Sequence, residues 1–154
     1  MSVLKNKRLE SKAQFVNTAN AIYTETINFL SRVSARYSRL IAEQTATLAG
    51  EVLDHAEKAN NIFPSDLQRV NLRKAHLIEA RASVMALDVR LTHCYLILMQ
   101  NPQGAFTNSK GEHLAASKAE EKLDNMSQKL GDLIDEEKKL LEGQIAKIGQ
   151  KIKK

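Results

Sequence analysis

The chain has 154 residues, 43% of them hydrophobic and 5% aromatic, which is enough for one domain with an ordinary core. Six glycines and two prolines provide too few turns for an all-β or doubly wound α/β fold, so an all-α fold is expected. The 23 Lys and Arg residues outnumber the 18 Asp and Glu residues, for a net charge of +5. A basic excess is typical of proteins that bind polyanions, although it also serves solubility alone.

The basic excess lies almost entirely in the first third of the chain. Residues 1–50 contain seven basic and three acidic residues, whereas residues 51–100 contain six of each. Residues 1–10 form a basic arm with Lys5, Lys7 and Arg8, and Lys12 follows it. The arm lacks the apolar run of a signal peptide, and no segment approaches 18 apolar residues. These features predict a cytoplasmic protein with no membrane partner.

Apolar spacing predicts three helices over residues 11–100. The first begins near Ser11, and a short connection near residues 32–36 separates it from the second. The pair Asn60-Asn61 ends the second helix, and a third starts with Pro64 or Ser65 near its cap. The third helix runs to about residue 100, because a residue before proline leaves helical geometry.

The third helix carries the strongest pattern in the chain. Its apolar residues recur at seven-residue spacing with apolar or small residues between them, and such a stripe requires cover from other helices. The members of this stripe are Val70, Leu77, Ala80, Val84, Leu87, Leu91, Cys94 and Leu98. The pattern therefore predicts a helical bundle.

Residues 101–114 contain two glycines and a proline and are expected to form a loop before a fourth helix over residues 115–154. That helix shows a heptad pattern that ends with Leu133 and Leu140, after which Leu141 and Ile148 continue in a shifted phase. The shift predicts that its last turns leave the bundle or pack on a neighbouring chain, or that they form a solvated tail. The expected architecture is a single antiparallel four-helix bundle domain over residues 1–154, with an extended fourth helix.

Candidate catalytic residues are few. None of the four histidines lies four residues from another His or Cys, so a helical metal pair is not expected. The acids around Glu136 and Glu137 lie in a Lys-rich helix and fit a solvated face better than a catalytic carboxylate pair. Cys94 lies on the apolar stripe and fits a core thiol, and no phosphate-binding or hydrolase motif occurs. A non-enzymatic protein without cofactor or metal is expected.

Two groups of basic residues lie on the predicted helices. If residues 32–39 are helical, Arg32, Arg36 and Arg39 share one helix face with Tyr37 beside them. Arginine suits phosphate because its planar group donates two hydrogen bonds at once. Arg69, Arg73 and Lys74 form a second group near the start of the third helix. An antiparallel bundle places residues 32–39 at the end near residue 100, and residues 5–12 and 60–74 at the other end. The alternative is that these are scattered surface arginines.

Several segments together resemble one protein family. They are MSVLKNKRLESK at the start, AN-x-I with TINFL, RYSR at 36–39, EKANNIF at 57–63, and LRKAHLIEARASVMALDVRL at 72–91. In this order the segments resemble the accessory variability determinant proteins of diversity-generating retroelements. Those proteins are similar to the four-helix bundles encoded in ribosomal RNA intervening sequences. The resemblance covers roughly residues 1–100.

The resemblance implies a pentameric ring of four-helix bundles that binds RNA or DNA and associates with a reverse transcriptase in mutagenic cDNA synthesis. The basic residues on matching positions are Lys5, Lys7, Arg8, Arg36, Arg39, Arg73 and Lys74, and Lys12 and Arg32 extend the same clusters. The alternative function is a structural oligomerisation protein that forms a helical bundle or coiled coil without binding nucleic acid.

Overall fold

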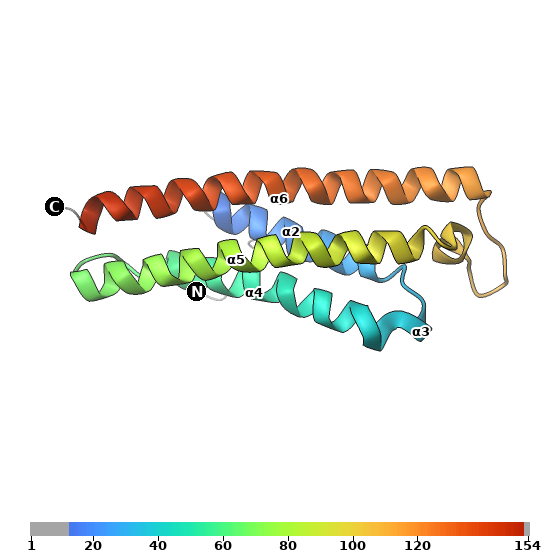
Figure 1. Cartoon of the computed structure of the whole chain (residues 1–154), viewed down its shortest axis with the longest axis horizontal. Coiled ribbons are helices and arrows are strands. Elements are labelled where there is room, and N and C mark those ends of the chain that lie inside the picture. The colour runs from blue at the N-terminus through green and yellow to red at the C-terminus, as the bar shows by residue number, and fades with distance from the viewer. Residues whose placement is uncertain (1–12, 153–154) are drawn as a thin grey trace, which may run out of the picture.

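The structure is a computed structural model that describes residues 13–152, and it is an antiparallel four-helix bundle. The long helices are α2 (Gln14–Leu30), α4 (Glu43–Asn61), α5 (Leu67–Leu98) and α6 (Ala116–Ile152). Both α4 and α6 pack against α2 and also against α5, so α2 and α5 occupy diagonal corners of the bundle (Figure 1). The all-α fold expected from the sequence is confirmed, and the described residues contain no β-strand.

The connection between α2 and α4 is partly helical. α2 ends at Leu30, and the Ser31 hydroxyl donates a 2.6 Å hydrogen bond to the Asn28 carbonyl, a local bond typical of helix ends. A short helix α3 (Ala35–Tyr37) and a π-helix η1 (Ser38–Ala42) then lead into α4. The non-helical residues are 31–34, so the short connection expected near residues 32–36 is present and ends two residues earlier than expected.

The start of α5 is capped by Asp66. Its carboxylate accepts a 2.8 Å hydrogen bond from the backbone N–H of Arg69, which satisfies one free donor of the first turn. Ser65 and Pro64 immediately precede this cap, so the expectation that the third helix starts with Pro64 or Ser65 near its cap is confirmed. A carboxylate at this position also interacts favourably with the positive end of the helix dipole.

The core forms around the apolar stripe of α5. All eight residues of the predicted stripe are buried, and Leu77, Val84 and Leu87 are completely inaccessible. Phe29 and Ile22 of α2 and Val52 of α4 fill the same core. The seven-residue spacing thus correctly identified the face of α5 that the other helices cover.

α6 stays in contact with the bundle beyond the point where its apolar pattern changes phase. Leu130, Ile134, Leu141 and Ile148 are all buried, so the expectation that the turns after Leu140 leave the bundle is wrong as far as Ile148. The earlier heptad phase would place the next core residue three positions after Leu130, but the buried residue is Ile134, four positions after it. This extra residue realigns a straight helix with its neighbours. The shift therefore keeps α6 on the core.

Glu137 is the main exception to the sequence-based assignment of surface residues. Its side chain is completely buried, and neither carboxylate oxygen has a hydrogen-bond partner within the described residues. The expectation of a solvated face at this residue is wrong, because Glu137 follows Ile134 by three residues and precedes Leu141 by four on the core side of α6.

The loop before α6 includes a short 3₁₀-helix η2 (Pro102–Phe106), which follows an Asn101 cap. None of the helices in the described part of the chain combines the length and the apolar content that are needed to cross a bilayer.

Candidate functional site

The candidate site lies at the end of the bundle where α2 ends and η2 precedes α6 (Figure 1). Arg32, two residues after α2, places its guanidinium carbon 4.8 Å from the centre of the Phe106 ring. This contact is a cation–π interaction, and it holds a planar donor group in a fixed orientation. The structure thus joins the turn after the first helix to the loop after α5, as the expected arrangement of helix ends requires.

Lys122 brings a second cation to the same ring. Its ammonium nitrogen lies 5.5 Å from the centre of the Phe106 ring, and Lys122 extends from the second turn of α6. Arg32, Phe106 and Lys122 line one hollow of about 350 Å³. Thr107, Asn108 and Leu114 complete its wall. Two positive charges and polar loop residues therefore surround a space that is open to solvent.

The cations of this hollow are not neutralised within the bundle. In the part of the chain that the structure describes, no carboxylate forms an ion pair with Arg32 or Lys122. The Nε atom of Arg32 is also buried without a hydrogen-bond acceptor. A buried donor without a partner costs about 1–3 kcal/mol.

Arg36 in α3 and Arg39 in η1 lie at the same end of the bundle as the hollow (Figure 1). Arg32 lies in the non-helical turn before α3, so no single helix carries all three arginines, and the helix face expected from their spacing does not form. The guanidinium carbon of Arg36 lies 5.9 Å from the centre of the Tyr37 ring, and both arginines are exposed. Arg39 lies in the π-helix η1, where Ile41 and Ala42 turn into the core. Short π-helices are frequent at functional sites. Neither arginine forms an ion pair within residues 13–152.

The second predicted basic group lies at the opposite end of the bundle and is tied into the fold. Arg69 forms an ion pair with Asp66, and Arg73 donates a 3.2 Å hydrogen bond to the Ile62 carbonyl. Burial lowers the pKa of Arg73. Lys74 follows on α5 and is half-buried. The structure therefore does not bring Arg73 and Lys74 together with Arg32, Arg36 and Arg39. The remaining predicted residues, Lys5, Lys7, Arg8 and Lys12, lie outside the described residues.

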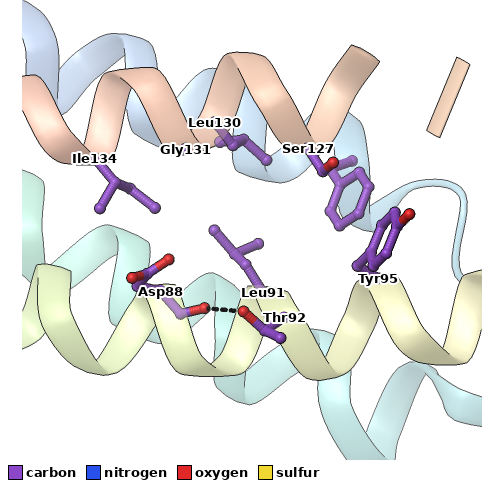
Figure 2. A pocket seen from close by; sticks show the side chains of 9 residues that line it. Asp88, Leu91, Thr92, Tyr95, Ser127, Leu130, Gly131 and Ile134 are labelled. Atoms are coloured by element: carbon purple, nitrogen blue, oxygen red, sulfur yellow. Dashed lines mark hydrogen bonds between the residues drawn. The ribbon is translucent and has the colours of Figure 1, made fainter. Parts of the chain in front are cut away.

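A different hollow of about 190 Å³ opens between α5 and α6. Figure 2 shows Leu91, Leu130 and Ile134 pointing toward it, with Asp88 and Tyr95 at its edge. The polar groups at this edge already have partners, because Asp88 forms an ion pair with Lys138 and the Tyr95 hydroxyl donates a hydrogen bond to Asp124. This hollow is mainly an apolar gap beside Gly131 and offers no free group for anion binding.

The structure also pairs two histidines that are far apart in sequence. The Nδ1 atoms of His55 on α4 and His76 on α5 lie 3.0 Å apart. The described residues contain no group of three or more His, Cys, Asp or Glu side chains that could hold a metal ion.

Sequence reasoning identified the arginines of the site but missed Phe106 and Lys122. Phe106 is an aromatic residue in a polar loop, and this was the only available signal for it. Lys122 has no distinguishing feature in a helix that alternates basic and acidic residues, and only the packing of α6 places it beside Arg32.

Comparison of the chain with protein-family models, curated proteins and solved structures finds no match.

Proposed function

We propose that this protein is a non-catalytic subunit that binds nucleic acid through the arginines at the α2–α3 end of the bundle. The observation that carries the proposal is the convergence of Arg32 and Lys122 on Phe106, without a neutralising carboxylate in the described residues. The phosphate groups of RNA or DNA are the anions that such a surface fits, since nucleic-acid affinity depends largely on Lys and Arg contacts to phosphate.

The mode of binding follows from these groups. The guanidinium group of Arg32 lies over Phe106 and Arg32 lines the open hollow, so its terminal N–H groups are the donors proposed to contact phosphate oxygens. Arg36 has the same arrangement on Tyr37. All four cations of the surface are suited to phosphate, and phosphate contacts position a protein on nucleic acid without reading its sequence. We therefore propose recognition of the backbone and its shape rather than of sequence.

The biological setting of the proposal comes from the resemblance of residues 1–100. We propose that the protein is the accessory protein of a diversity-generating retroelement and associates with the reverse transcriptase during mutagenic cDNA synthesis. Self-association belongs to the same proposal. A reverse-transcriptase gene next to the gene for this chain is the observation that supports this setting most directly.

The binding proposal is tested with paired variants on one helix. Lys122→Glu changes a cation of the hollow, and Lys139→Glu makes the same change at an exposed position farther along α6. We expect Lys122→Glu to reduce the affinity for a labelled single-stranded RNA by about tenfold and Lys139→Glu to reduce it much less. Equal losses for the two variants contradict a localised site, and no binding by the native chain contradicts the function.

A second candidate function is a structural protein that self-associates without binding nucleic acid. The observation that favours it is a row of exposed apolar residues on α5, which includes Met85, Val89 and Leu96 at 44%, 57% and 56% exposure. Binding of RNA by the native chain, weakened about tenfold in Lys122→Glu, supports the first candidate, and no binding of RNA by the native chain supports the second.

A further inference from the structure

α5 carries a second apolar seam on the side that faces away from the core. Ile78, Met85, Val89 and Leu96 are between 44% and 57% exposed, although each is a large hydrophobic residue. They are separated by seven, four and seven residues, so they lie on one line along the helix. The buried stripe of Leu77, Leu87 and the other core residues lies on the opposite side.

Small residues complete this exposed seam as a heptad pattern. Ala75 and Ala82 are exposed and occupy the intervening positions, so the series Ala75, Ile78, Ala82, Met85, Val89 and Leu96 follows alternating steps of three and four residues, with Thr92 between the last two. This is the spacing by which two helices pack side by side in a coiled coil. Within the described residues no other helix covers the seam. A bundle that buries one seam of α5 and exposes another resembles one half of an interface.

The sizes of the residues in the seam fit a second copy of the same helix in antiparallel orientation. When Met85 lies opposite the partner's Met85, the small Ala82 lies within one residue of the level of the partner's Val89. By the same register, Ala75 lies within one residue of the level of the partner's Leu96. Val89 and Leu96 thus each meet an alanine, and Met85 meets its own copy at the axis. A pattern that complements itself about one central residue is the property of a two-fold interface.

The charges beside the seam fit the same register. In an antiparallel pair, residues on one flank of a helix meet the same flank of the partner. Glu79 lies on one flank, where this register places it near the partner's Arg90. Arg81 and Asp88 lie on the other flank. Arg81 falls near the partner's Asp88, and Asp88 falls near the partner's Arg81. The two-fold axis repeats both contacts, so every cross-pair joins opposite charges.

Glu79 and Arg90 have no ion pair within the described residues, whereas Arg81 and Asp88 already pair with Glu142 and Lys138 of α6. The first flank therefore offers free partners to a second chain. On the second flank, contacts with the partner would join the existing Arg81–Glu142 and Asp88–Lys138 ion pairs into a network.

We infer that a second copy of this chain binds the exposed face of α5, with the two α5 helices antiparallel about a two-fold axis at Met85. The overlap runs from about residue 73 to Leu98, or about 40 Å of helix. This inference rests on the self-association in the proposed function and specifies its contact. A two-fold pair differs from the pentameric ring that the resemblance implies, because a five-fold ring joins two different surfaces of each subunit.

Cross-linking through single cysteines tests the axis. Met85→Cys places two thiols at the axis, and a short thiol-to-thiol cross-linker should convert most of the chain to a species of twice 17.2 kDa. Ile78→Cys is the matched control, since the two copies of residue 78 would lie about 20 Å apart. The native chain provides the blank, because Cys94 is buried.

A charge exchange at Glu79 and Arg90 tests the register. Glu79→Arg should raise the dimer dissociation constant by about tenfold, because two opposite-charge contacts become two like-charge contacts. Combining Glu79→Arg with Arg90→Glu should restore the native value, and circular dichroism verifies folding of both variants.

Sedimentation distinguishes the failures. A dimer that cross-links at residue 85 and not at residue 78 supports the inference. A pentamer without the residue 85 cross-link overturns the two-fold contact but leaves the proposed self-association standing. A monomer at tens of micromolar overturns both.

Discussion

His55 and His76 face each other across α4 and α5, with their Nδ1 atoms 3.0 Å and their ring centres 5.2 Å apart. Two protonated imidazoles at this distance would repel each other strongly. Partial burial lowers the pKa of His76, and the charges of His55 and Lys58 lower it further, against an opposing effect of Glu79. The pair is therefore built for the neutral form of His76.

We therefore expect the bundle to become less stable at acidic pH because His76 is protonated. The unfolded chain binds a proton at His76 near pH 6.5, whereas the folded protein binds it only at lower pH. The stability from neutral His76 is present above pH 6.5 and is lost as the pH falls below it. We expect His76→Gln to reduce the drop in melting temperature between pH 7.5 and pH 5.5. His93→Gln, at an exposed position, should leave that drop unchanged, and an equal effect of the two variants would refute the role of the pair.

Glu137 should make the folded protein less stable as the pH rises, which is the opposite of the effect expected from His76. Burial, with a smaller effect of Glu136, raises the pKa of Glu137 to about 8. The folded protein therefore keeps this proton while the unfolded chain loses it near pH 4.3. The stabilisation is complete below pH 4.3, declines as the pH rises and is lost above about pH 8, with an upper limit of about 5 kcal/mol.

We expect Glu137→Gln to raise the melting temperature at pH 9 and to reduce the loss of stability between pH 6 and pH 9. Glu121→Gln is the matched control, because this glutamate lies on the same helix and is exposed. Denaturant titrations at a series of pH values measure the effect. A native chain whose stability is constant between pH 6 and pH 9 would show that Glu137 is not buried in the folded protein.

The apolar stripe of α5 predicts a large energetic difference between its two faces. Leu87 is completely buried, and Leu87→Ala should destabilise the protein by about 2–5 kcal/mol through lost contacts and a cavity. Leu72 on the same helix is 49% exposed, and Leu72→Ala should cost less than about 1 kcal/mol. Urea unfolding compares the two variants, and similar losses would contradict the assignment of the core face.

We expect the Cys94 thiol of the folded protein to be labelled slowly by thiol reagents. Cys94 is completely buried beside Thr45, and burial raises the pKa of its thiol despite the Thr45 hydrogen bond. The thiolate is the reactive form, so a disulfide reagent should label the native protein far more slowly than the urea-unfolded chain. Equal labelling rates in the two states would place Cys94 at the surface.

The parts of the fold that the sequence predicts are those fixed by local repetition. Leu77, Val84 and Leu91 recur every seven residues, so the buried face of α5 follows from helical geometry alone. Asn101-Pro102 likewise marks the end of α5, because proline excludes helical geometry in the residue before it.

The parts that the sequence does not predict depend on packing between distant segments. Glu137 lies in a charged run, and a charge there normally indicates solvent, so only the register of α6 against its neighbours reveals its burial. Lys122 and Phe106 are ordinary residues until the bundle places them beside Arg32. The candidate site was thus half predictable. The sequence places the three arginines close together in the chain, but Arg32 lies in the turn after α2, and the ring and the second cation beside it come from other segments.

Arg32, Arg36, Arg39 and Lys122 are the residues proposed to contact phosphate, and the salt dependence of RNA binding measures these contacts. Each phosphate contact contributes about −0.7 to −0.9 to the slope of log affinity against log salt concentration, so four contacts predict a slope of about −3.

We expect the double variant Arg32→Ala with Lys122→Ala to retain its helix content and to reduce the magnitude of this slope by about 1.5. Fluorescence anisotropy at four salt concentrations measures both slopes on the same labelled RNA. A native slope near −3 that falls to about half in the double variant is the predicted result. A native slope near zero, or the same slope in the two proteins, would contradict the account.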